Sequence, residues 1–300
     1  MRIPPDPRRY RAFGFAWRSD IALDGFDPAP FADSDAAPIY VYRADRLADR
    51  GQGRAVDSGF LYADGIRFRW AEEVVFDIFA SAIAYAPGRD WTGCMPASFY
   101  STVAALLAAW RGLVPLHAGA VAVDGRAVLV AGPAGAGKST LTAGLVDHGA
   151  RFIADDLVVL SVAAGRITVA PGRPTIRLHP DTAREIDPAA VPVIGDPLGK
   201  WLARPRHRLG ESIDLGAMLI LGADADSAPA ARLLPHLFRR RRMAALPMRD
   251  ALVRDLLAIA MRAPILAYPV QTDNGVEARR ARVARAIAEA RRAMAHDIRA

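Results

Sequence analysis

The chain has 300 residues, of which 52% are hydrophobic and 24% are charged, a balance typical of a globular protein with a full core. The amino-terminal residues lack the apolar core of a secretory signal peptide, and the longest apolar runs are too short to span a bilayer. Because Cys94 is the single cysteine, no intrachain disulfide can form, and we expect a cytoplasmic protein with no membrane partner.

The formal net charge is +7, and all of the 39 basic residues except Lys138 and Lys200 are arginine. A positive charge favours anionic partners, nucleic acid included. The sequence has no zinc-finger spacing, no helix-turn-helix signal and no basic motif interleaved with aromatic residues. A solvated basic surface is therefore the simpler interpretation, and we expect no nucleic-acid partner.

Residues 1–95 are expected to form a small accessory α+β segment. The stretches 38–47 and 58–70 have the composition of strands, and Asp64-Gly65 in the second is a typical hairpin turn. An apolar-periodic stretch follows at 72–84, and then a break rich in proline and glycine. The next strongly periodic run, 98–110, predicts a helix, so we place a domain boundary near residue 95.

Residues 96–300 alternate short apolar strands with helical runs, which predicts an α/β domain with a mixed sheet. Asp124-Gly125 joins the first two of these strands as a two-residue hairpin, and Gly149 is a good carboxy-terminal cap for the helix before it. The expected strands are 116–123, 126–131, 166–172, 175–178 and 216–221, with a further extended segment at 151–162 that two aspartates interrupt. The expected helices are 138–148, 249–261 and 276–299.

The stretch between strand 126–131 and helix 138–148 fits the phosphate-binding loop pattern G-x-x-x-x-G-K-S without a mismatch. Glycines allow close backbone approach, so that successive N–H groups and the helix amino terminus can point at one anion. Lys138 is expected to reach the β- and γ-phosphates, and the Ser139 hydroxyl to ligate Mg²⁺. The residues expected to bind the nucleotide are Gly132, Pro133, Ala134, Gly135, Ala136, Gly137, Lys138, Ser139 and Thr140.

The next acidic cluster, Asp155-Asp156, ends an apolar strand seventeen residues after Lys138. If the chain bends there, one carboxylate can ligate Mg²⁺ while the other accepts the proton of an attacking hydroxyl. A pair of aspartates that caps a turn is the alternative interpretation. His117, on the first hairpin strand, can orient a catalytic aspartate, although a lone histidine in an apolar strand is more often a core residue.

Together these residues resemble the catalytic domain of HPr kinase/phosphorylase, most clearly over residues 116–160, where a histidine, a hairpin, a phosphate loop and an aspartate pair occur in order. The resemblance implies a P-loop kinase core of the HPr kinase and PEP carboxykinase-like type. It also implies ATP- and Mg²⁺-dependent phosphorylation of a serine-type hydroxyl. Asp155 would be the base, Asp156 a metal ligand with Ser139, His117 the partner of the base, and Lys138 a phosphate contact; the two aspartates can exchange roles.

The family motif N-I-R-G-L-G is replaced here by "TIRLHPD", so a peptide or protein serine fits as well as HPr as the acceptor, and we expect a serine-type hydroxyl of a peptide or protein. The alternatives are a small-molecule or carboxykinase-like phosphotransferase, and a nucleotide-binding regulatory or maturation factor with little turnover.

Three further features each have two interpretations. Lys200 can contact phosphate or remain on the surface. The arginines 239–242 can clamp an acidic substrate or form a solvated loop. The last helical run repeats apolar residues at Val283, Ile287, Met294 and Ile298, which suits either core packing or the seam of a homo-oligomer.

Overall fold

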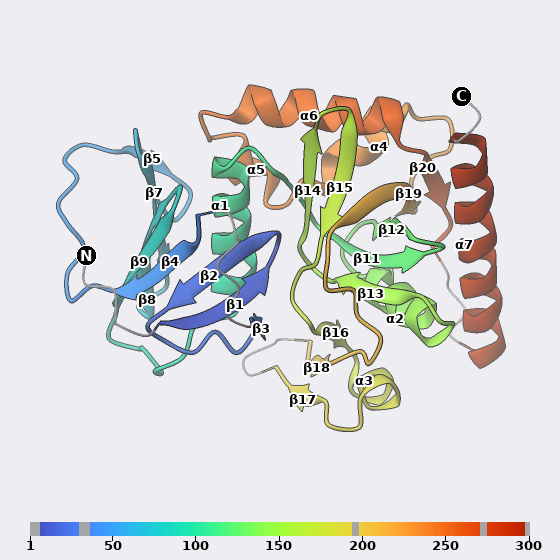
Figure 1. Ribbon diagram of the computed structural model, residues 1–300, viewed down its shortest axis with the longest axis horizontal. Coiled ribbons are helices and arrows are strands. Elements are labelled where there is room, and N and C mark those ends of the chain that lie inside the picture. Colours follow the sequence, from blue (N-terminus) through green and yellow to red (C-terminus); the bar gives the residue numbers. More distant parts are fainter. Residues whose placement is uncertain (1–6, 30–36, 194–197, 271–274, 298–300) are drawn as a thin grey trace.

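The computed structural model describes residues 7–29, 37–193, 198–270 and 275–297. The protein has a mixed α/β architecture in which two large sheets lie side by side, with helix α1 (Ala104–Trp110) between them (Figure 1). The first sheet comes entirely from the amino-terminal part of the chain, whereas the second carries the glycine-rich loop.

Nine strands of the described chain form the first sheet, and most of them pair antiparallel with their neighbours; the exceptions are the parallel pairs β2–β4 and β4–β9. Their bounds are β1 Arg8–Ala12, β2 Phe15–Ser19, β3 Asp27–Pro28, β4 Ile39–Arg43, β5 Arg54–Val56, β6 Gly59–Tyr62, β7 Gly65–Trp70, β8 Val74–Phe79 and β9 Ala82–Pro87. The expected α+β segment is wrong in this respect, because the described residues up to 95 contain strands and no helix. The apolar stretch 72–84 forms the hairpin β8–β9, and its Val, Phe and Ile residues pack well on a pleated surface.

The hairpin β6–β7 turns one residue earlier than the sequence predicts, at Ala63-Asp64, since Tyr62 already pairs with Gly65. Gly65 therefore belongs to the strand. A Cβ atom there would lie 2.2 Å from the carbonyl oxygen of Ile78 on the neighbouring strand. The glycine is needed for close approach of two strands rather than for the turn.

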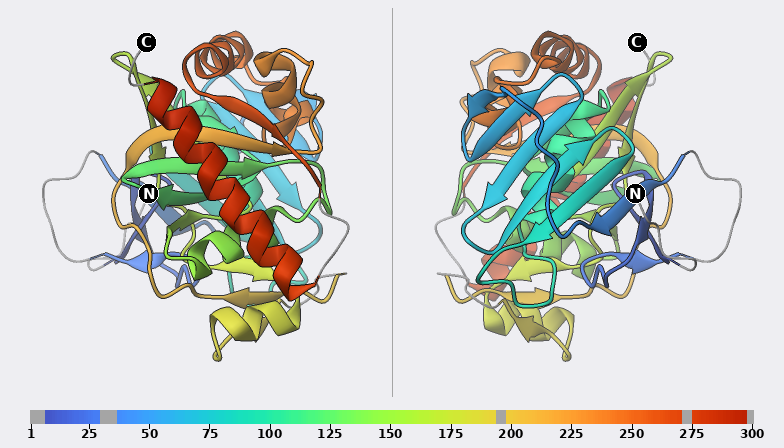
Figure 2. Two further views of the ribbon diagram at one scale, coloured as in Figure 1. Left: turned by 90° about the vertical axis from the view of Figure 1, so that its right-hand side faces the viewer. Right: turned by 90° about the vertical axis from the view of Figure 1, so that its left-hand side faces the viewer.

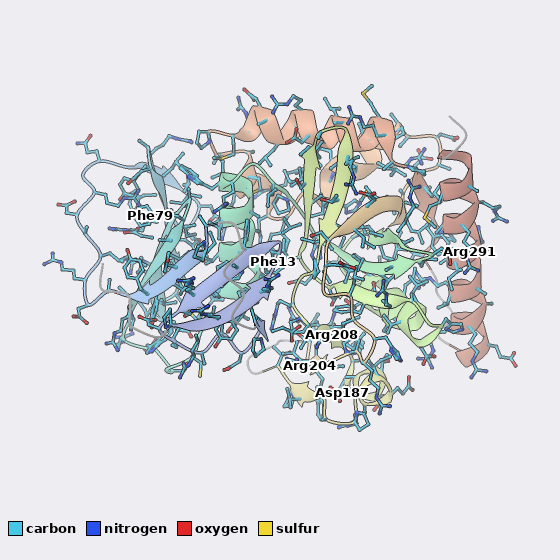
Figure 3. The ribbon with its side chains drawn as sticks, viewed as in Figure 1. Phe13, Phe79, Asp187, Arg204, Arg208 and Arg291 are labelled. Carbon is cyan, nitrogen blue, oxygen red and sulfur yellow. The ribbon has the colours of Figure 1, made fainter. Side chains whose placement is uncertain are left out.

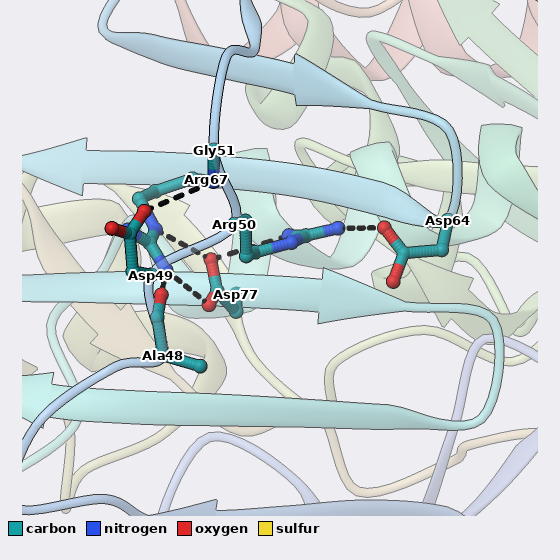
Figure 4. Close-up of polar contacts among 7 residues, drawn as sticks. All are labelled: Ala48, Asp49, Arg50, Gly51, Asp64, Arg67 and Asp77. Atoms are coloured by element: carbon teal, nitrogen blue, oxygen red, sulfur yellow. Dashed lines mark hydrogen bonds and ion pairs between the residues drawn. The ribbon is translucent and has the colours of Figure 1, made fainter.

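One carboxylate is buried in this sheet, and two arginines compensate its charge (Figure 4). Asp77 is 2% exposed and accepts two hydrogen bonds from Arg67, at 2.8 and 2.7 Å. Arg50 also approaches Asp77, at 3.4 Å, and pairs with the exposed Asp64. A buried carboxylate is tolerated only with such partners, so this cluster is a fixed part of the sheet.

The second sheet runs in the order β10-β14-β15-β19-β12-β11-β13, with β20 added beside β19. Its central strand, β19, pairs parallel with β12 and β20 and antiparallel with β15, so the sheet is mixed as the sequence predicts. The bounds are β10 Val114–Leu116, β11 Ala118–Val123, β12 Arg126–Ala131, β13 Arg151–Ala154, β14 Val158–Ala163, β15 Arg166–Ala170, β19 Ile213–Leu221 and β20 Ile265–Tyr268.

The helices cover the second sheet from several sides (Figures 1 and 2). Their bounds are α2 Lys138–Asp147, α3 Pro180–Ile186, α4 Pro229–Leu233, α5 Arg240–Met243, α6 Arg249–Arg262 and α7 Val276–Asp297, and a π-helical turn, Phe99–Val103, leads into α1. Helix α7 packs against β19 and α2. None of the helices in the described residues combines the length and the apolar composition needed to cross a bilayer.

A small third sheet lies beside α3, formed by β16 (Ile176–Leu178), β18 (Trp201–Ala203) and β17 (Val191–Pro192). The segment after it returns to the first sheet. There Arg204 and Arg208, which are labelled in Figure 3, both pair with Asp27 of β3. Asp187, labelled nearby, accepts the backbone N–H of Arg204.

Two clusters of buried apolar residues make up the core. The larger one joins the first sheet, α1 and one face of the second sheet. The smaller one lies under α2 and α7, on the other face. Because the larger cluster is continuous across both sheets, the first sheet is packed firmly onto the rest of the protein. The domain boundary near residue 95 stays a prediction.

Candidate functional site

The glycine-rich loop connects the end of β12 to the first residue of α2. Gly132 has φ 152° and Gly137 has φ 86°, both in the range that favours glycine. A Cβ on Gly132 would also lie 2.8 Å from Cβ of Leu221 on β19. Only glycine at position 132 therefore lets the loop turn sharply beside the sheet. Helix α2 begins at Lys138, where the loop ends.

Lys138, the first residue of α2, folds back over the loop. Its Nζ donates to the carbonyl oxygens of Gly132 and Pro133, both at 3.0 Å. Burial lowers the pKa of Lys138, and the negative charges of Asp155 and Asp156 oppose this shift. The ammonium group is thus held at the inner edge of the loop, where it faces the groups that the loop would bind.

Asp155 directly follows β13 and reaches the second residue of α2. The Ser139 hydroxyl lies 3.0 and 3.1 Å from the two carboxylate oxygens of Asp155, and the backbone N–H of Arg177 donates to Oδ2 at 3.1 Å. Asp155 is only 5% exposed. Burial raises the pKa of its carboxyl, the Arg177 N–H lowers it, and the neighbouring charge of Asp156 raises it further.

Asp156 turns the other way because its backbone is left-handed, with φ 69°. Its Oδ1 lies 3.2 Å from Nδ1 of His117, and the same nitrogen lies 2.9 Å from the Asp156 carbonyl oxygen. Since both oxygens are acceptors, we infer that Nδ1 carries the proton. Burial raises the pKa of Asp156, but the hydrogen bond and the charge of His117, together with the charges of Arg177 and Arg173, outweigh burial, so the pKa is lowered.

The two aspartates therefore have different partners, because the left-handed backbone at residue 156 turns the second side chain away from the first. The side chain of Asp156 is 29% exposed and that of His117 is 38% exposed, whereas Asp155 is enclosed. A group from outside the protein can reach the Asp156–His117 pair more easily than it can reach Asp155.

A second histidine, His236, lies next to His117 and was missed by the sequence analysis. The backbone N–H of His117 donates to the His236 carbonyl oxygen at 2.8 Å. Burial lowers the pKa of His236 to about 4, and the charges of Lys138 and His117 add to this shift. His236 is thus neutral near pH 7. It lies in the apolar run "LLPHLF", where no local pattern indicates a site.

The two histidines line a cavity of about 450 Å³ on the outer side of the glycine-rich loop. The opposite wall comes from Gly132, Pro133 and Ala134 of the loop and from Asp224 and Arg232 in the chain after β19. Residues 132–134 of the loop belong to its wall, and the charge of Lys138 lowers the pKa of His236 in that wall, so a phosphate on the loop and a second molecule in the cavity would be neighbours.

Two further arginines place positive charge near the aspartate pair. Both Arg177 and Arg173 lower the pKa of Asp156. Arg173 also lies over the ring of Tyr100, 4.8 Å from its centroid, and the described residues offer its buried Nε no hydrogen-bond partner. These arginines follow β15 in the segment "GRPTIRL", where only the resemblance to a family drew attention to them.

The remaining sequence-predicted features lie in different places. Lys200 is partly buried, and its charge lowers the pKa of Lys138, so it lies near the loop. Of the four arginines 239–242, Arg242 pairs with Asp57 of the first sheet and covers the ring of Phe68, whereas the other three are exposed.

The apolar side of α7 faces the interior of the described molecule. Val283 and Met294 are buried in the smaller core cluster, and Ile287 packs against it. Ile298 lies outside the described residues. Core packing accounts for these positions, and the homo-oligomer stays a prediction.

Ser139 and Asp155 bring two oxygen ligands to one point, and in the described part of the chain no group of three or more His, Cys, Asp or Glu side chains could hold a metal. Mg²⁺ in phosphoryl-transfer sites is typically held by one or two protein oxygens together with substrate phosphates and water. The donor set thus fits Mg²⁺ that arrives with a nucleotide, and it does not form a complete metal cage.

Comparisons with known proteins find a weak structural likeness and no family. No protein-family model matches the chain, and neither does any curated protein. Among solved structures the chain is similar to the Hpr(Ser) kinase/phosphatase from Coxiella burnetii, with 16% sequence identity over 38% of this chain and 68% of that chain and a TM-score of 0.27. This distant structural neighbour is a kinase/phosphatase, but the likeness is too low to assign the chain to a family.

Proposed function

We propose that this protein is an ATP- and Mg²⁺-dependent kinase that transfers the γ-phosphoryl group to a serine-type hydroxyl of a peptide or protein. One observation carries the proposal: Asp155 is hydrogen-bonded to Ser139 at the start of α2, while the adjacent Asp156 is paired with His117. The two arrangements suit a metal ligand and a base, side by side, at the end of a glycine-rich loop.

The loop and the start of α2 are suited to bind the β- and γ-phosphates. The backbone N–H groups around Gly137 lie at the amino terminus of a ten-residue helix, whose partial positive charge favours an anion. Lys138 would exchange its contacts with two loop carbonyls for contacts with phosphate oxygens. Because the protein donors are already oriented, binding would need little rearrangement of the loop.

For the aspartates we propose the reverse of the roles that the family resemblance implies. Asp155 and Ser139 would hold Mg²⁺, since they are the enclosed pair of oxygen ligands. When bound, Mg²⁺ would neutralise charge on the phosphoryl oxygens. The raised pKa of Asp155 also fits a carboxylate that awaits a cation, because a nearby positive charge favours its ionised form.

Asp156 would act as the base. Its lowered pKa keeps it ionised throughout the neutral pH range, and the Nδ1–H of His117 holds its carboxylate in place. The acceptor oxygen would attack the γ-phosphorus in line, its proton would pass to Asp156, and the bond from the γ-phosphorus to the bridging oxygen would break as ADP leaves. Arg173 and Arg177 would balance the charge of the transferred group.

The acceptor hydroxyl is expected to enter through the cavity beside His117 and His236. This cavity is open to the surface and lies next to the loop, and its volume of about 450 Å³ accommodates a residue side chain with its flanking backbone. A small-molecule acceptor would use the same entrance, so a transfer assay with peptides distinguishes a peptide acceptor from a small molecule.

The test is transfer of label from γ-labelled ATP to serine- and threonine-containing peptides, with ADP measured in parallel. We expect Mg²⁺-dependent labelling by the wild type and a loss of at least about a hundredfold in Asp156→Asn. Asp124→Asn is the matched control: Asp124 lies in the distant β11–β12 turn, also with positive φ, and should leave transfer unchanged. Labelling that Asp156→Asn leaves intact would contradict the mechanism, and nucleotide binding without transfer to any hydroxyl would favour a regulatory factor.

A further inference from the structure

A second cavity lies along α2, and it shares no lining residue with the cavity beside His117. It has a volume of about 280 Å³ and is enclosed by α2, α3 and the first turns of α7. Figure 2 shows these turns of α7 beside α2, with α3 below them. Thr140, which directly follows Ser139, belongs to its wall, so the cavity begins where the glycine-rich loop ends.

Arg282 of α7 lies where this cavity meets the loop. Its Nη1 is 3.3 Å from the position that a Cβ on Gly137 would take. Its Nε and Nη2 are buried, and no hydrogen-bond partner for them occurs among the described residues. Buried N–H groups are costly when they lack an acceptor, so these two nitrogens of the partly buried Arg282 are suited to receive an acceptor oxygen.

The position of Arg282 is fixed by its surroundings. Its carbonyl oxygen accepts the hydroxyl of Tyr268 from β20 at 2.7 Å. The next residue, Val283, packs closely on Gly144 of α2: a Cβ on Gly144 would lie 2.6 Å from Cγ2 of Val283. Helix α7 thus approaches α2 at a glycine, and these contacts fix the backbone from which the Arg282 side chain reaches the start of α2.

We infer that this cavity binds the nucleoside of the ATP substrate and that Arg282 binds the α-phosphate, an inference that rests on the proposed function. A phosphate chain on the loop would run along the start of α2, which brings the α-phosphate past Thr140 towards Arg282. The volume of about 280 Å³ lies just below the roughly 300–1,000 Å³ range of ligand pockets, so it suits a base and ribose but not a whole nucleoside triphosphate.

The walls of the cavity offer the contacts that a nucleoside needs. Leu141, Ile186 and Val283 supply apolar surface for the base. Asp147 and Glu185 supply carboxylates that can accept hydrogen bonds from ribose hydroxyls or an exocyclic amine. The cavity beside His117 then stays free for the acceptor, with the γ-phosphate between the two cavities.

The test compares ATP with inorganic tripolyphosphate, each with Mg²⁺, by calorimetric titration of the full-length protein. Thr182→Trp, on α3, fills the cavity without touching the loop, and Arg282→Gln removes the charged donor. Arg291→Gln is the control for Arg282, because Arg291, labelled in Figure 3, is on the same helix but pairs with Asp124 and does not line the cavity.

We expect Thr182→Trp to weaken ATP binding at least about tenfold and to leave tripolyphosphate binding within about twofold of the wild type. Arg282→Gln should weaken both ligands about tenfold, because the third phosphate of tripolyphosphate replaces the α-phosphate. Retained tripolyphosphate binding also shows that the Thr182→Trp protein is folded.

Unchanged ATP affinity in Thr182→Trp would overturn the nucleoside cavity while leaving the phosphate loop in place. Unchanged affinity for both ligands in Arg282→Gln would overturn the role of Arg282. A wild-type protein that binds neither ligand would end the proposed function itself, and this result differs from both of the others.

Discussion

Replacing Asp156 with asparagine separates the proposed base from its structural surroundings. Asparagine keeps the shape of the side chain and tolerates the left-handed backbone at this position, where φ is 69°. The Nδ1–H of His117 would still donate to the backbone carbonyl oxygen of residue 156, which lies 2.9 Å away in the wild type. The variant should therefore fold normally and bind MgATP with an affinity within about threefold of the wild type.

The rate of phosphoryl transfer should fall sharply in this variant. General base catalysis contributes about 10²- to 10⁴-fold, which corresponds to about 3–5 kcal/mol of activation free energy. Steady-state kinetics with a labelled peptide acceptor would measure kcat and the KM for ATP for Asp156→Asn and Asp155→Asn. We expect Asp156→Asn to lose kcat alone, and Asp155→Asn to lose Mg²⁺-dependent ATP binding as well.

The opposite pattern would refute this assignment. If Asp155→Asn lost kcat with normal MgATP binding while Asp156→Asn stayed active, Asp155 would be the base and the contact with Ser139 would be a feature of the nucleotide-free state.

Three further predictions concern stability and the loop. The folded-state pKa of His236, about 4, lies below its ordinary value of 6.5, so the stability contributed by the neutral imidazole is complete above pH 6.5 and is lost as the pH falls towards 4. Urea unfolding at pH 7 and at pH 4.5 would measure how much free energy of unfolding each protein loses between the two values. This loss should be smaller in His236→Gln than in the wild type, by up to roughly 3 kcal/mol, and equal losses would contradict the shift. Asp77→Ala should lower the free energy of unfolding by about 3–5 kcal/mol, because it leaves the charge of Arg67 unpaired within the sheet. The control is Asp64→Ala, which removes the exposed partner of Arg50 and should cost below about 1 kcal/mol. Similar values for the two variants would be inconsistent with the buried cluster. Gly132→Ala should lower ATP affinity at least about tenfold because its Cβ would collide with Leu221, and binding equal to the wild type by titration would show that the loop does not need its observed shape.

Local signals in the sequence predicted much of the second sheet and of the loop. Asp124 and Gly125 both have positive φ in the predicted two-residue turn, and Gly149 ends α2 with φ 93°. Each of these features depends on a few neighbouring residues, so local sequence is enough to specify it.

Other features depend on contacts between distant parts of the chain, which the sequence does not encode locally. The partners of Asp155 and Asp156 follow from a left-handed residue and from strand pairing across β11, and neither is visible in a pair of adjacent aspartates. His236 and Arg282 reach the site from segments about 100 and 140 residues beyond Lys138 in the chain. The first sheet was incompletely predicted because its short strands pair partly in parallel, with long-range partners.

The most direct measurement is the equilibrium affinity for ATP, with and without Mg²⁺, of the wild type and of Ser139→Ala. If Ser139 and Asp155 complete a metal site on a phosphate-binding loop, Mg²⁺ should strengthen ATP binding to the wild type at least about tenfold, and this gain should disappear in Ser139→Ala. The same gain from Mg²⁺ in both proteins, or no ATP binding by the wild type, would contradict the site at its centre.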